Sequence, residues 1–186
     1  IRKIIKIAKK YNLIVIEDAA ECIGSFYFKR HLGTFGDVGI ISFNGNKTIT
    51  TGAGGIILTN DRKLAIQARH VTHNSKLVSN YQILHDKLGY NYRMSNLNAA
   101  IGCAQLEKIG KILNAKRRLF KKYKKELFIF KELKLFEEPK NSHSNYWLNT
   151  VLVSKNHKNA KAQIIHYCNK RGLKVRPAWQ LMHKIK

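Results

Sequence analysis

The chain has 186 residues, and its hydrophobic share of 44% and charged share of 25% are those of a soluble globular protein of one or two domains. The longest apolar runs are strand-sized and too short to cross a bilayer. Three distant cysteines, Cys22, Cys103 and Cys168, match neither a metal-binding spacing nor a disulfide framework. A membrane-spanning segment, a zinc site and an exported disulfide scaffold are therefore not predicted, and we expect a cytoplasmic protein.

Lys and Arg outnumber Asp and Glu by 35 to 11, which gives a formal net charge of +24 at pH 7. Such an excess is compatible with nucleic-acid binding, which stays open as an alternative. The basic residues are dispersed, however, and no known nucleic-acid-binding motif accompanies them. Solvated helix surfaces explain the charge better, and they could also attract an anionic substrate that carries a diphosphate.

The first elements predict an α/β fold. Apolar residues recur at helical spacing over residues 1–11, and residues 13–16 then form an apolar run typical of a fully buried strand. This run ends at Glu17 and Asp18. Ligands of α/β sheets bind outside the carboxyl ends of the strands, so Asp18 is well placed for function.

A second buried strand is predicted over residues 38–43, and a Gly-containing bend brings Lys47 directly after it. A Thr- and Gly-rich loop over 50–55 and a third strand over 56–58 follow. Asp61 is expected to cap a helix over 62–70, and residues 72–87 are expected to form a surface or interface loop. Ser95 is expected to cap a long helix that contains residues 97–109, and a Lys-rich amphipathic helix continues from there towards residue 127.

A domain boundary is expected in the segment from 131 to 144, which contains Pro139 and little periodicity. We therefore divide the chain into a large domain over 1–130 and an incomplete small α+β domain over 131–186. In the latter, strands are predicted over 146–153 and 173–176 and a helix over 160–171. The chain starts at Ile1 inside a helical pattern and ends at Lys186 in a basic-apolar stretch, so we expect a fragment.

Two residues have the setting of a catalytic site. Lys47 follows a buried strand and precedes a loop whose backbone N–H groups could hold a phosphate, and a lysine in such a pocket can form a Schiff base. Ser42 could add a hydroxyl donor. Asp18 could pair with a protonated pyridine nitrogen, although the spacing equally fits an ordinary salt bridge. Spacing alone identifies no cofactor.

Several motifs, in order, narrow this choice. They are residues 16–21 (IEDAAE), 33–37 (GTFGD), 42–47 (SFNGNK) with 50–55 (TTGAGG), 89–96 (GYNYRMSN) and 99–106 (AAIGCAQL). Together they resemble the signatures of the DegT/DnrJ/EryC1/StrS family of sugar aminotransferases, over nearly the whole chain. The resemblance implies the pyridoxal-phosphate-dependent transferase fold of type I, aspartate-aminotransferase-like, here with part of its large and part of its small domain.

The resemblance also implies roles for individual residues. Lys47 matches the lysine that binds the cofactor pyridoxal phosphate and moves protons, and Asp18 matches the carboxylate that keeps its pyridine nitrogen protonated. Ser42 matches a phosphate-binding hydroxyl. Asn91 matches a residue that reaches the phosphate from the neighbouring subunit of a homodimer, and Arg93 could assist there.

The chain departs from the family at Glu21, where Gln or His usually contacts the cofactor's ring hydroxyl. A carboxylate there would repel a phenolate oxygen unless it is protonated or turned away. Arg176 and His183 resemble a later motif with a role toward substrate or in packing. Tyr146 and Trp147 are expected in the small-domain core rather than as a stacking platform, and His31, His70, His73 and His85 at the surface or in loops.

The resemblance further implies the reaction. An amino group would pass from glutamate to a nucleotide-linked keto-sugar, and residues 44–52 favour C4 of a 4-keto-6-deoxy sugar, as on routes to perosamine and to bacillosamine- or legionaminate-type sugars. Lys47 argues against the family's dehydratase branch, in which His replaces the lysine. Such products enter lipopolysaccharide and other surface glycans. The alternatives are a catalytically silent fragment of such an enzyme and, less favoured, the basic nucleic-acid-binding protein.

Overall fold

The computed structural model describes residues 1–79, 81–157 and 159–185. It consists of two compact units, here called unit 1 and unit 2. Unit 1 comprises residues 1–120 and 138–148, and unit 2 comprises residues 121–137 and 149–186. The division of the chain into a large domain over 1–130 and a small domain over 131–186 stays a prediction. None of the helices in the described ranges is long and apolar enough to cross a membrane.

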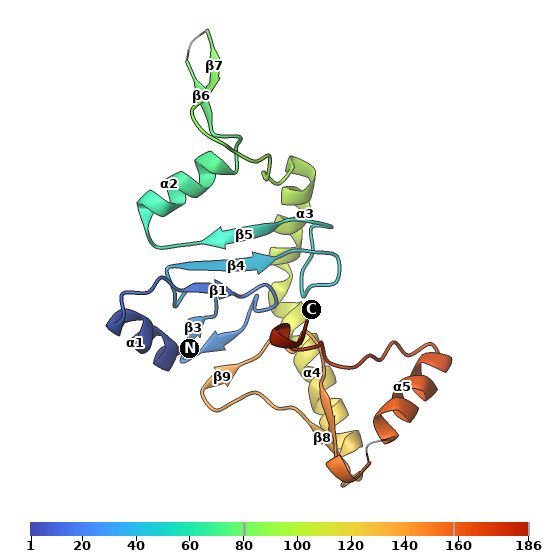
Figure 1. The fold of residues 1–186 in the computed structure, drawn as a ribbon. Coiled ribbons are helices and arrows are strands. Elements are labelled where there is room, and N and C mark those ends of the chain that lie inside the picture. Colours follow the sequence, from blue (N-terminus) through green and yellow to red (C-terminus); the bar gives the residue numbers. More distant parts are fainter. Residues whose placement is uncertain (80, 158, 186) are drawn as a thin grey trace. The chain divides into compact units, whose positions relative to one another are not determined.

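The elements follow one another in the order labelled in Figure 1. The helices are α1 (Arg2–Lys10), α2 (Arg62–Val71), α3 (Asn96–Glu107), α4 (Ile109–Leu127) and α5 (Ala160–Lys170), with short 3-10 turns η1 (Lys155–His157) and η2 (Met182–Lys184). The strands are β1 (Ile16–Asp18), β2 (Phe26–Tyr27), β3 (Arg30–His31), β4 (Val38–Ser42), β5 (Gly55–Leu58), β6 (Lys76–Val78), β7 (Ile83–His85), β8 (Leu133–Leu135), β9 (Ser142–His143) and β10 (Val151–Val153). This mixture confirms the predicted α/β class.

A three-stranded sheet in the order β1-β4-β5 is the framework of unit 1 (Figure 1). β1 and β4 are parallel, with Asp18 opposite Ile40, whereas β5 returns antiparallel to β4. Ile41 on β4 is only 2% exposed and belongs to the core. Because parallel strands end at the same edge, the residues that follow β1 and β4 lie together.

The first strand differs from its prediction in two respects. It begins at Ile16 instead of residue 13, because the Asp37 carboxylate accepts a hydrogen bond from the Val15 N–H (2.8 Å) where β4 begins. Nor is the apolar run fully buried: Leu13, Ile14 and Ile16 are 60%, 79% and 64% exposed. Val15, between them, is half-buried.

The loop between β3 and β4 is fixed by the carboxylate of Glu17. Its two oxygens accept hydrogen bonds from the N–H groups of Gly36 (2.6 Å) and Gly33 (3.0 Å). Gly33 has φ +88°, and a Cβ on Gly39 would lie only 1.8 Å from the Gly33 carbonyl oxygen. Gly33 and Gly39 therefore serve backbone geometry.

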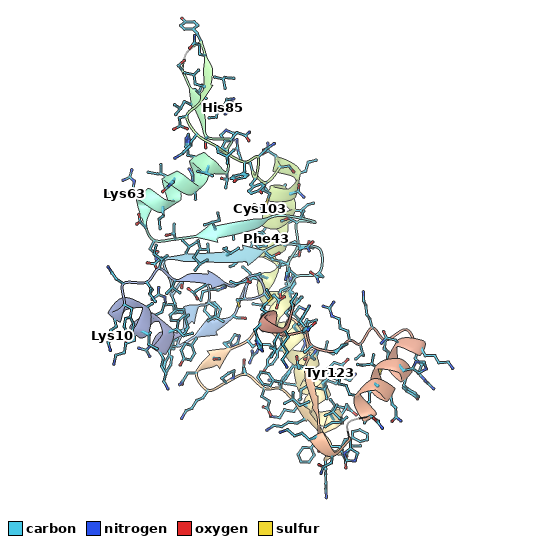
Figure 2. All side chains as sticks on the ribbon, in the orientation of Figure 1. Lys10, Phe43, Lys63, His85, Cys103 and Tyr123 are labelled. Atoms are coloured by element: carbon cyan, nitrogen blue, oxygen red, sulfur yellow. The ribbon has the colours of Figure 1, made fainter. Side chains whose placement is uncertain are left out.

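Helix capping follows the sequence closely. The Asp61 carboxylate accepts hydrogen bonds from the N–H groups of Lys63 and Leu64, and the Ser95 hydroxyl accepts one from the N–H of Asn98. The helices predicted after Ser95 are confirmed as α3 and α4, which are separated at Lys108. Lys10 on α1 and Lys63 on α2 are exposed, as expected of solvated basic surfaces (Figure 2).

The segment over 72–87, expected to be a surface or interface loop, contains the antiparallel hairpin of β6 and β7, which projects away from the sheet of unit 1 (Figure 1). Val78 and Tyr81 are 76% and 96% exposed, and residue 80 lies outside the described residues. The strands form through backbone pairing alone, without the alternating buried face on which a sequence-based strand assignment depends.

In unit 2, β8 and β10 form an antiparallel pair with Leu135 buried, and α5 confirms the predicted helix. The strand predicted over 146–153 is reduced to its last three residues, β10. The strand predicted over 173–176 is absent: these described residues pair with no partner strand. Both segments contain apolar residues typical of strands. A strand also needs a neighbouring strand to pair with, and composition does not show whether one is there.

Candidate active site

The carboxyl ends of β1 and β4 bring the predicted site residues of unit 1 to one edge of the sheet. Asp18 ends β1 and Ser42 ends β4. Beyond the strands the two segments stay joined, because the Ser42 N–H donates to the Ala20 carbonyl at 3.3 Å. Glu21 and Lys47 follow on these same segments, so all four side chains belong to one region.

Lys47 is presented by a tight turn. Its backbone N–H donates to the Asn44 carbonyl (3.0 Å), and the next two residues, Thr48 and Ile49, are buried and anchor the loop. The lysine side chain is only 13% exposed. Its amine donates to the Glu21 carboxylate across 3.0 Å, and Glu21 itself is 44% exposed. The amine is therefore partly shielded from water and directed at an anionic group.

Trp147, which lies far from Lys47 along the chain, contacts the same lysine. The Lys47 Nζ lies 4.7 Å from the centroid of the Trp147 ring, within the range of a cation–π interaction. The indole N–H donates to the Asn46 carbonyl at 2.6 Å. The expectation that Trp147 belongs to the core of the small domain is wrong, because residues 138–148 return to unit 1.

Asn145 fastens this returning segment. Its side-chain amide donates to the carbonyls of Glu21 (2.7 Å) and Ile23 (2.9 Å), and its side-chain oxygen accepts from the Trp147 N–H (2.9 Å). Asn145 is 4% exposed, so these bonds are formed away from water. One buried amide thus links the two residues that contact Lys47.

Tyr146 is buried as expected, but in unit 1, where its ring stacks on Phe120 with centroids 3.8 Å apart. Its backbone φ is +45°, which is unusual for a bulky residue. This conformation separates two neighbouring side chains. Tyr146 packs inward, while Trp147 reaches Lys47.

Asp18 and Ser42 keep hydrogen-bonding capacity for a ligand. Asp18 is exposed, contrary to the expected buried strand end, and its Oδ1 accepts from the Ala20 N–H at 3.2 Å. Its Oδ2 has no partner among the residues that the structure describes. The Ser42 Oγ accepts from the Asn44 N–H at 3.2 Å, which leaves its own proton to donate.

The region is also negatively charged, in contrast to the chain as a whole. Burial raises the pKa of the Cys22 thiol, and the carboxylates of Glu21, Asp18 and Glu17 raise it further. Three carboxylates thus act on the Cys22 thiol, and one of them, Glu21, also pairs with the Lys47 amine.

The comparisons with known proteins decide the family. The model of the DegT/DnrJ/EryC1/StrS aminotransferase family matches residues 1–186. The chain belongs to this family. Aminotransferases of the DegT/DnrJ/EryC1/StrS family use pyridoxal phosphate. The solved structures that resemble this chain include both the PLP form and the PMP form of a protein from Streptococcus pneumoniae titled a putative sugar aminotransferase.

The sequence relatives include proteins named for nucleotide-sugar chemistry. The chain is 43% identical to the GDP-perosamine synthase of Escherichia coli O157:H7 over 151 residues, which are 81% of this chain and 41% of that protein. It is 35% identical to the putative pyridoxal phosphate-dependent aminotransferase EpsN of Bacillus subtilis, covering 97% of this chain and 46% of EpsN. The chain thus spans about half the length of the curated relatives it matches.

Solved structures confirm the predicted fold type. PseC of Helicobacter pylori, an aminotransferase involved in the biosynthesis of pseudoaminic acid, matches with a TM-score of 0.92 over 98% of this chain and 50% of PseC, at 22% identity. A DegT/DnrJ/EryC1/StrS aminotransferase from Brucella abortus matches with a TM-score of 0.78 and 28% identity, over 98% of this chain and 48% of that one.

Two further predicted residues, Asn91 and Arg93, lie in unit 1 after the hairpin of β6 and β7. Asn91 forms an isolated bridge with His73, and the Arg93 guanidinium lies 3.4 Å from the His73 ring. Both are exposed. In the part of the chain that the structure describes, neither residue forms a hydrogen bond with Lys47, and the role of Asn91 in a neighbouring subunit stays a prediction.

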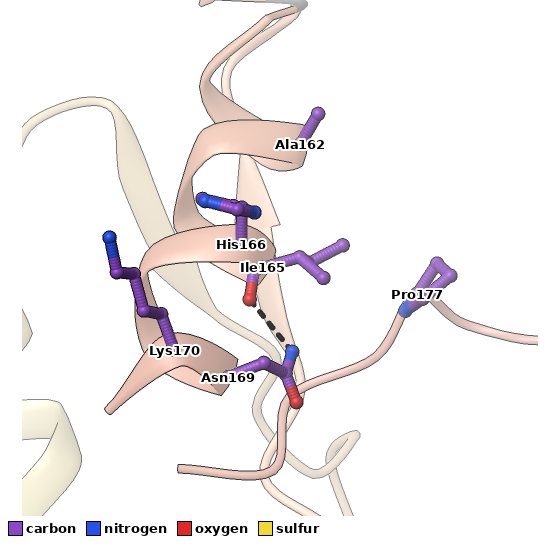
Figure 3. Close-up of a pocket in the computed structure, with 6 residues that line it drawn as sticks. All are labelled: Ala162, Ile165, His166, Asn169, Lys170 and Pro177. Carbon is purple, nitrogen blue, oxygen red and sulfur yellow. Dashed lines mark hydrogen bonds between the residues drawn. The ribbon is translucent and has the colours of Figure 1, made fainter. Parts of the chain in front are cut away.

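Arg176 and His183 lie in unit 2. The Arg176 guanidinium packs over the Trp179 ring at 4.9 Å, and His183 belongs to the exposed turn η2. A pocket of about 540 Å³ lies beside α5, lined by Ala162, Ile165, His166, Asn169, Lys170 and Pro177 (Figure 3). Neither Arg176 nor His183 is among its lining residues.

Sequence reasoning missed Trp147, Asn145 and Glu17. Trp147 and Asn145 lie about a hundred residues from Lys47 along the chain, so no local spacing connects them to it. Glu17 lies beside Asp18 in the motif, and its hydrogen bonds to the loop over 33–36 were not foreseen. His31 is also more than a loop residue, because its Nε2 accepts from the Gly24 N–H at 2.9 Å.

Proposed function

We propose that the protein is a pyridoxal-phosphate-dependent transaminase that transfers an amino group from glutamate to a nucleotide-linked keto-sugar, with Lys47 as its cofactor-binding lysine. The observation that carries the proposal is the setting of Lys47. Its amine is held at the carboxyl edge of β1 and β4, 3.0 Å from Glu21 and against the face of Trp147. This is the place in an α/β sheet where ligands bind.

The residues present fit this cofactor by their chemistry. When bound, pyridoxal phosphate supplies an aldehyde carbon and a ring that withdraws electrons. Lys47, after losing a proton, can form a carbon–nitrogen bond to such a carbon while water leaves. Asp18 Oδ2 can hold a proton on a pyridine nitrogen, and the Ser42 hydroxyl can donate to a phosphate oxygen.

Lys47 is also suited to move protons during the transfer. An amine that alternates between neutral and protonated forms can act as base and then as acid, so one residue serves both half-reactions. Glu21 offers the protonated form a partner 3.0 Å away. Shielding by Trp147 and the low exposure of the Lys47 side chain limit competition from bulk water.

The proposed acceptor is C4 of a 4-keto-6-deoxy sugar, and the product is destined for surface polysaccharide, lipopolysaccharide included. The GDP-perosamine synthases of Escherichia coli, Vibrio cholerae and Caulobacter vibrioides, at 34% to 43% identity, support this substrate class. The net charge of +24 would assist capture of an anionic nucleotide sugar.

We also propose a cytoplasmic homodimer in which Asn91 reaches the phosphate of the neighbouring subunit's cofactor. Its support is the exposure of Asn91 beside a projecting hairpin. Arg93, on the same exposed segment, would assist there, and Arg176 and His183 would act on the substrate side. These four roles rest on the family motifs.

The test is an absorbance scan of the protein, expressed from its complete gene, with added pyridoxal phosphate, followed by borohydride reduction and peptide mapping. We expect a visible absorption band, and the reduced label on Lys47. Lys47→Ala should lose both. Lys63→Ala, which removes an exposed lysine of α2, is the matched control and should keep both. Peptide mapping is essential because exposed lysines also react with free aldehydes.

The second stage adds glutamate and then a nucleotide-linked 4-keto-6-deoxy sugar. Glutamate should convert the absorption band to that of the aminated cofactor, and the sugar should restore it. A labelled Lys47 without turnover would support the catalytically silent alternative. No label on Lys47 in the complete gene product would refute the proposed function.

A further inference from the structure

We infer that Trp147 is a positioning residue for Lys47: it holds the lysine amine in the place from which it reacts with an aldehyde. The inference rests on the proposed function of Lys47 and adds a residue that the sequence motifs do not include. Trp147 reaches the lysine from a segment 100 residues later in the chain, which the structure folds back into unit 1.

The first argument is that Trp147 acts on both ends of the lysine. Its ring face lies 4.7 Å from the Lys47 Nζ, and its indole N–H donates to the carbonyl of Asn46, the residue before Lys47. The first contact restricts the end of a four-carbon side chain, and the second fixes the backbone from which that chain starts. A flexible lysine therefore loses much of its conformational freedom before any ligand binds.

The second argument is that Trp147 is itself firmly held. Asn145 accepts from its N–H at 2.9 Å, and the Lys116 amine donates to its carbonyl at 3.3 Å. The preceding residue, Tyr146, has φ +45° and is locked against Phe120. A backbone conformation of this kind in a bulky residue persists only where the surroundings enforce it, and such strain gathers at functional sites.

The third argument is that Trp147 is better suited than Glu21 to keep the Lys47 amine in position. Glu21 is 44% exposed, and an ion pair with such a partner is weak and sensitive to salt. The indole face offers an attraction that leaves the amine free to turn toward a ligand. Trp147 should therefore affect how fast Lys47 reacts more than how tightly a phosphate-bearing ligand binds.

The experiment measures these two quantities separately in variants at Trp147, in the protein expressed from its complete gene. Stopped-flow absorbance gives the rate at which the borohydride-reducible adduct forms on Lys47. Binding of pyridoxamine phosphate, which lacks the aldehyde, gives the affinity. We expect Trp147→Leu to slow adduct formation about five- to tenfold, and Trp147→Phe, which keeps an aromatic face, about two- to threefold. The affinity for pyridoxamine phosphate should change less than about twofold.

A spectroscopic readout reports on Trp147 without mutating it. The chain has two tryptophans, so Trp179→Phe in unit 2 leaves the fluorescence of Trp147 alone. That fluorescence should be quenched with the same rate constant as adduct formation. Trp179→Phe also serves as the matched control, and its adduct should form at the wild-type rate.

The outcomes distinguish the inference from the proposed function. If the wild-type protein labels no Lys47, the proposed function fails. If it does, and folded Trp147→Leu reacts at the wild-type rate, Trp147 has no positioning role. If Trp147→Leu does not fold, the decision falls to the other readouts: an unchanged rate in Trp147→Phe, or unquenched Trp147 fluorescence while the adduct forms, would overturn the inference.

Discussion

The amine of Lys47 lies 3.0 Å from the carboxylate of Glu21, so the proposed cofactor-binding lysine forms an ion pair with the residue at which this chain departs from its family's usual pattern. A neutral Gln or a His at this position would contact a ring hydroxyl. The carboxylate instead offers the lysine a partner of opposite charge. Binding of the cofactor would require Lys47 to leave that partner and Glu21 to tolerate a phenolate oxygen nearby.

Glu21→Gln should therefore bind pyridoxal phosphate more tightly and form the Lys47 adduct faster. The substitution removes both the ion pair and the repulsion while keeping the size of the side chain. Because exposed ion pairs are weak, we expect an increase of about two- to fivefold. Titration by absorbance, at low and at high salt, measures it, and salt should accelerate the wild-type protein more than the variant.

Glu107→Gln, an exposed position on α3, is the charge-matched control for this substitution and should leave both quantities unchanged. Weaker binding in Glu21→Gln would contradict the prediction and would mean that the carboxylate assists the reaction.

Glu17→Gln should destabilise the protein although the residue contacts no predicted ligand. The carboxylate accepts from the N–H groups of Gly33 and Gly36, and an amide can accept only one of these bonds while directing its own NH₂ at the other donor. We expect a loss of about 1–3 kcal/mol, measured by urea unfolding followed by circular dichroism. Full stability in the variant would show that water replaces the lost acceptor without penalty.

Much of unit 1 could be predicted from the sequence because its signals are local. β4 and β5, the cap of α2 by Asp61 and the cap of α3 by Ser95 depend on residues a few positions apart. The motif residues Asp18, Ser42 and Lys47 do lie at one sheet edge, as their strand ends predicted. The family, its fold type and its cofactor followed from motifs that no single spacing supplies, and the comparisons confirm them.

What the sequence could not supply depends on contacts between distant segments. The return of residues 138–148 to unit 1 brings Trp147 to Lys47, and periodicity contains no information on such a return. The exposed β6–β7 hairpin and the shortened β10 show the same limit, since strands need partners whose identity a local pattern does not state.

Asn145→Ala should affect both stability and the site. It leaves the carbonyls of Glu21 and Ile23 and the N–H of Trp147 without their buried partner, so we expect a loss of about 2 kcal/mol or more in the free energy of unfolding. Because Trp147 is then less firmly held, adduct formation on Lys47 should also slow under conditions where the variant is folded. Asn149→Ala removes a side-chain amide of unit 2 and should not slow the adduct. A variant at Asn145 that loses stability but keeps the wild-type rate would contradict the link to Trp147.

The last prediction concerns acid. The Arg117 guanidinium donates two hydrogen bonds to the Glu138 carboxylate, at 2.7 and 3.0 Å, and thereby holds the pKa of Glu138 below its ordinary value, with the Ser144 N–H adding to the effect. A carboxylate whose pKa is lower in the folded state stabilises the protein fully above its unfolded pKa, near 4.3. That contribution is lost as the pH falls from there through the lower folded pKa. Glu138→Gln should thus lose about 1–2 kcal/mol at pH 7 and show a flatter decline of its urea midpoint between about pH 5 and 3.

Asp86 also has a lowered pKa, through its hydrogen bond with His70, but it is present in both proteins and cancels in the comparison. Glu132→Gln, at an exposed position, should follow the wild-type curve, and an unchanged slope in Glu138→Gln would show that the Arg117–Glu138 pair does not control acid stability.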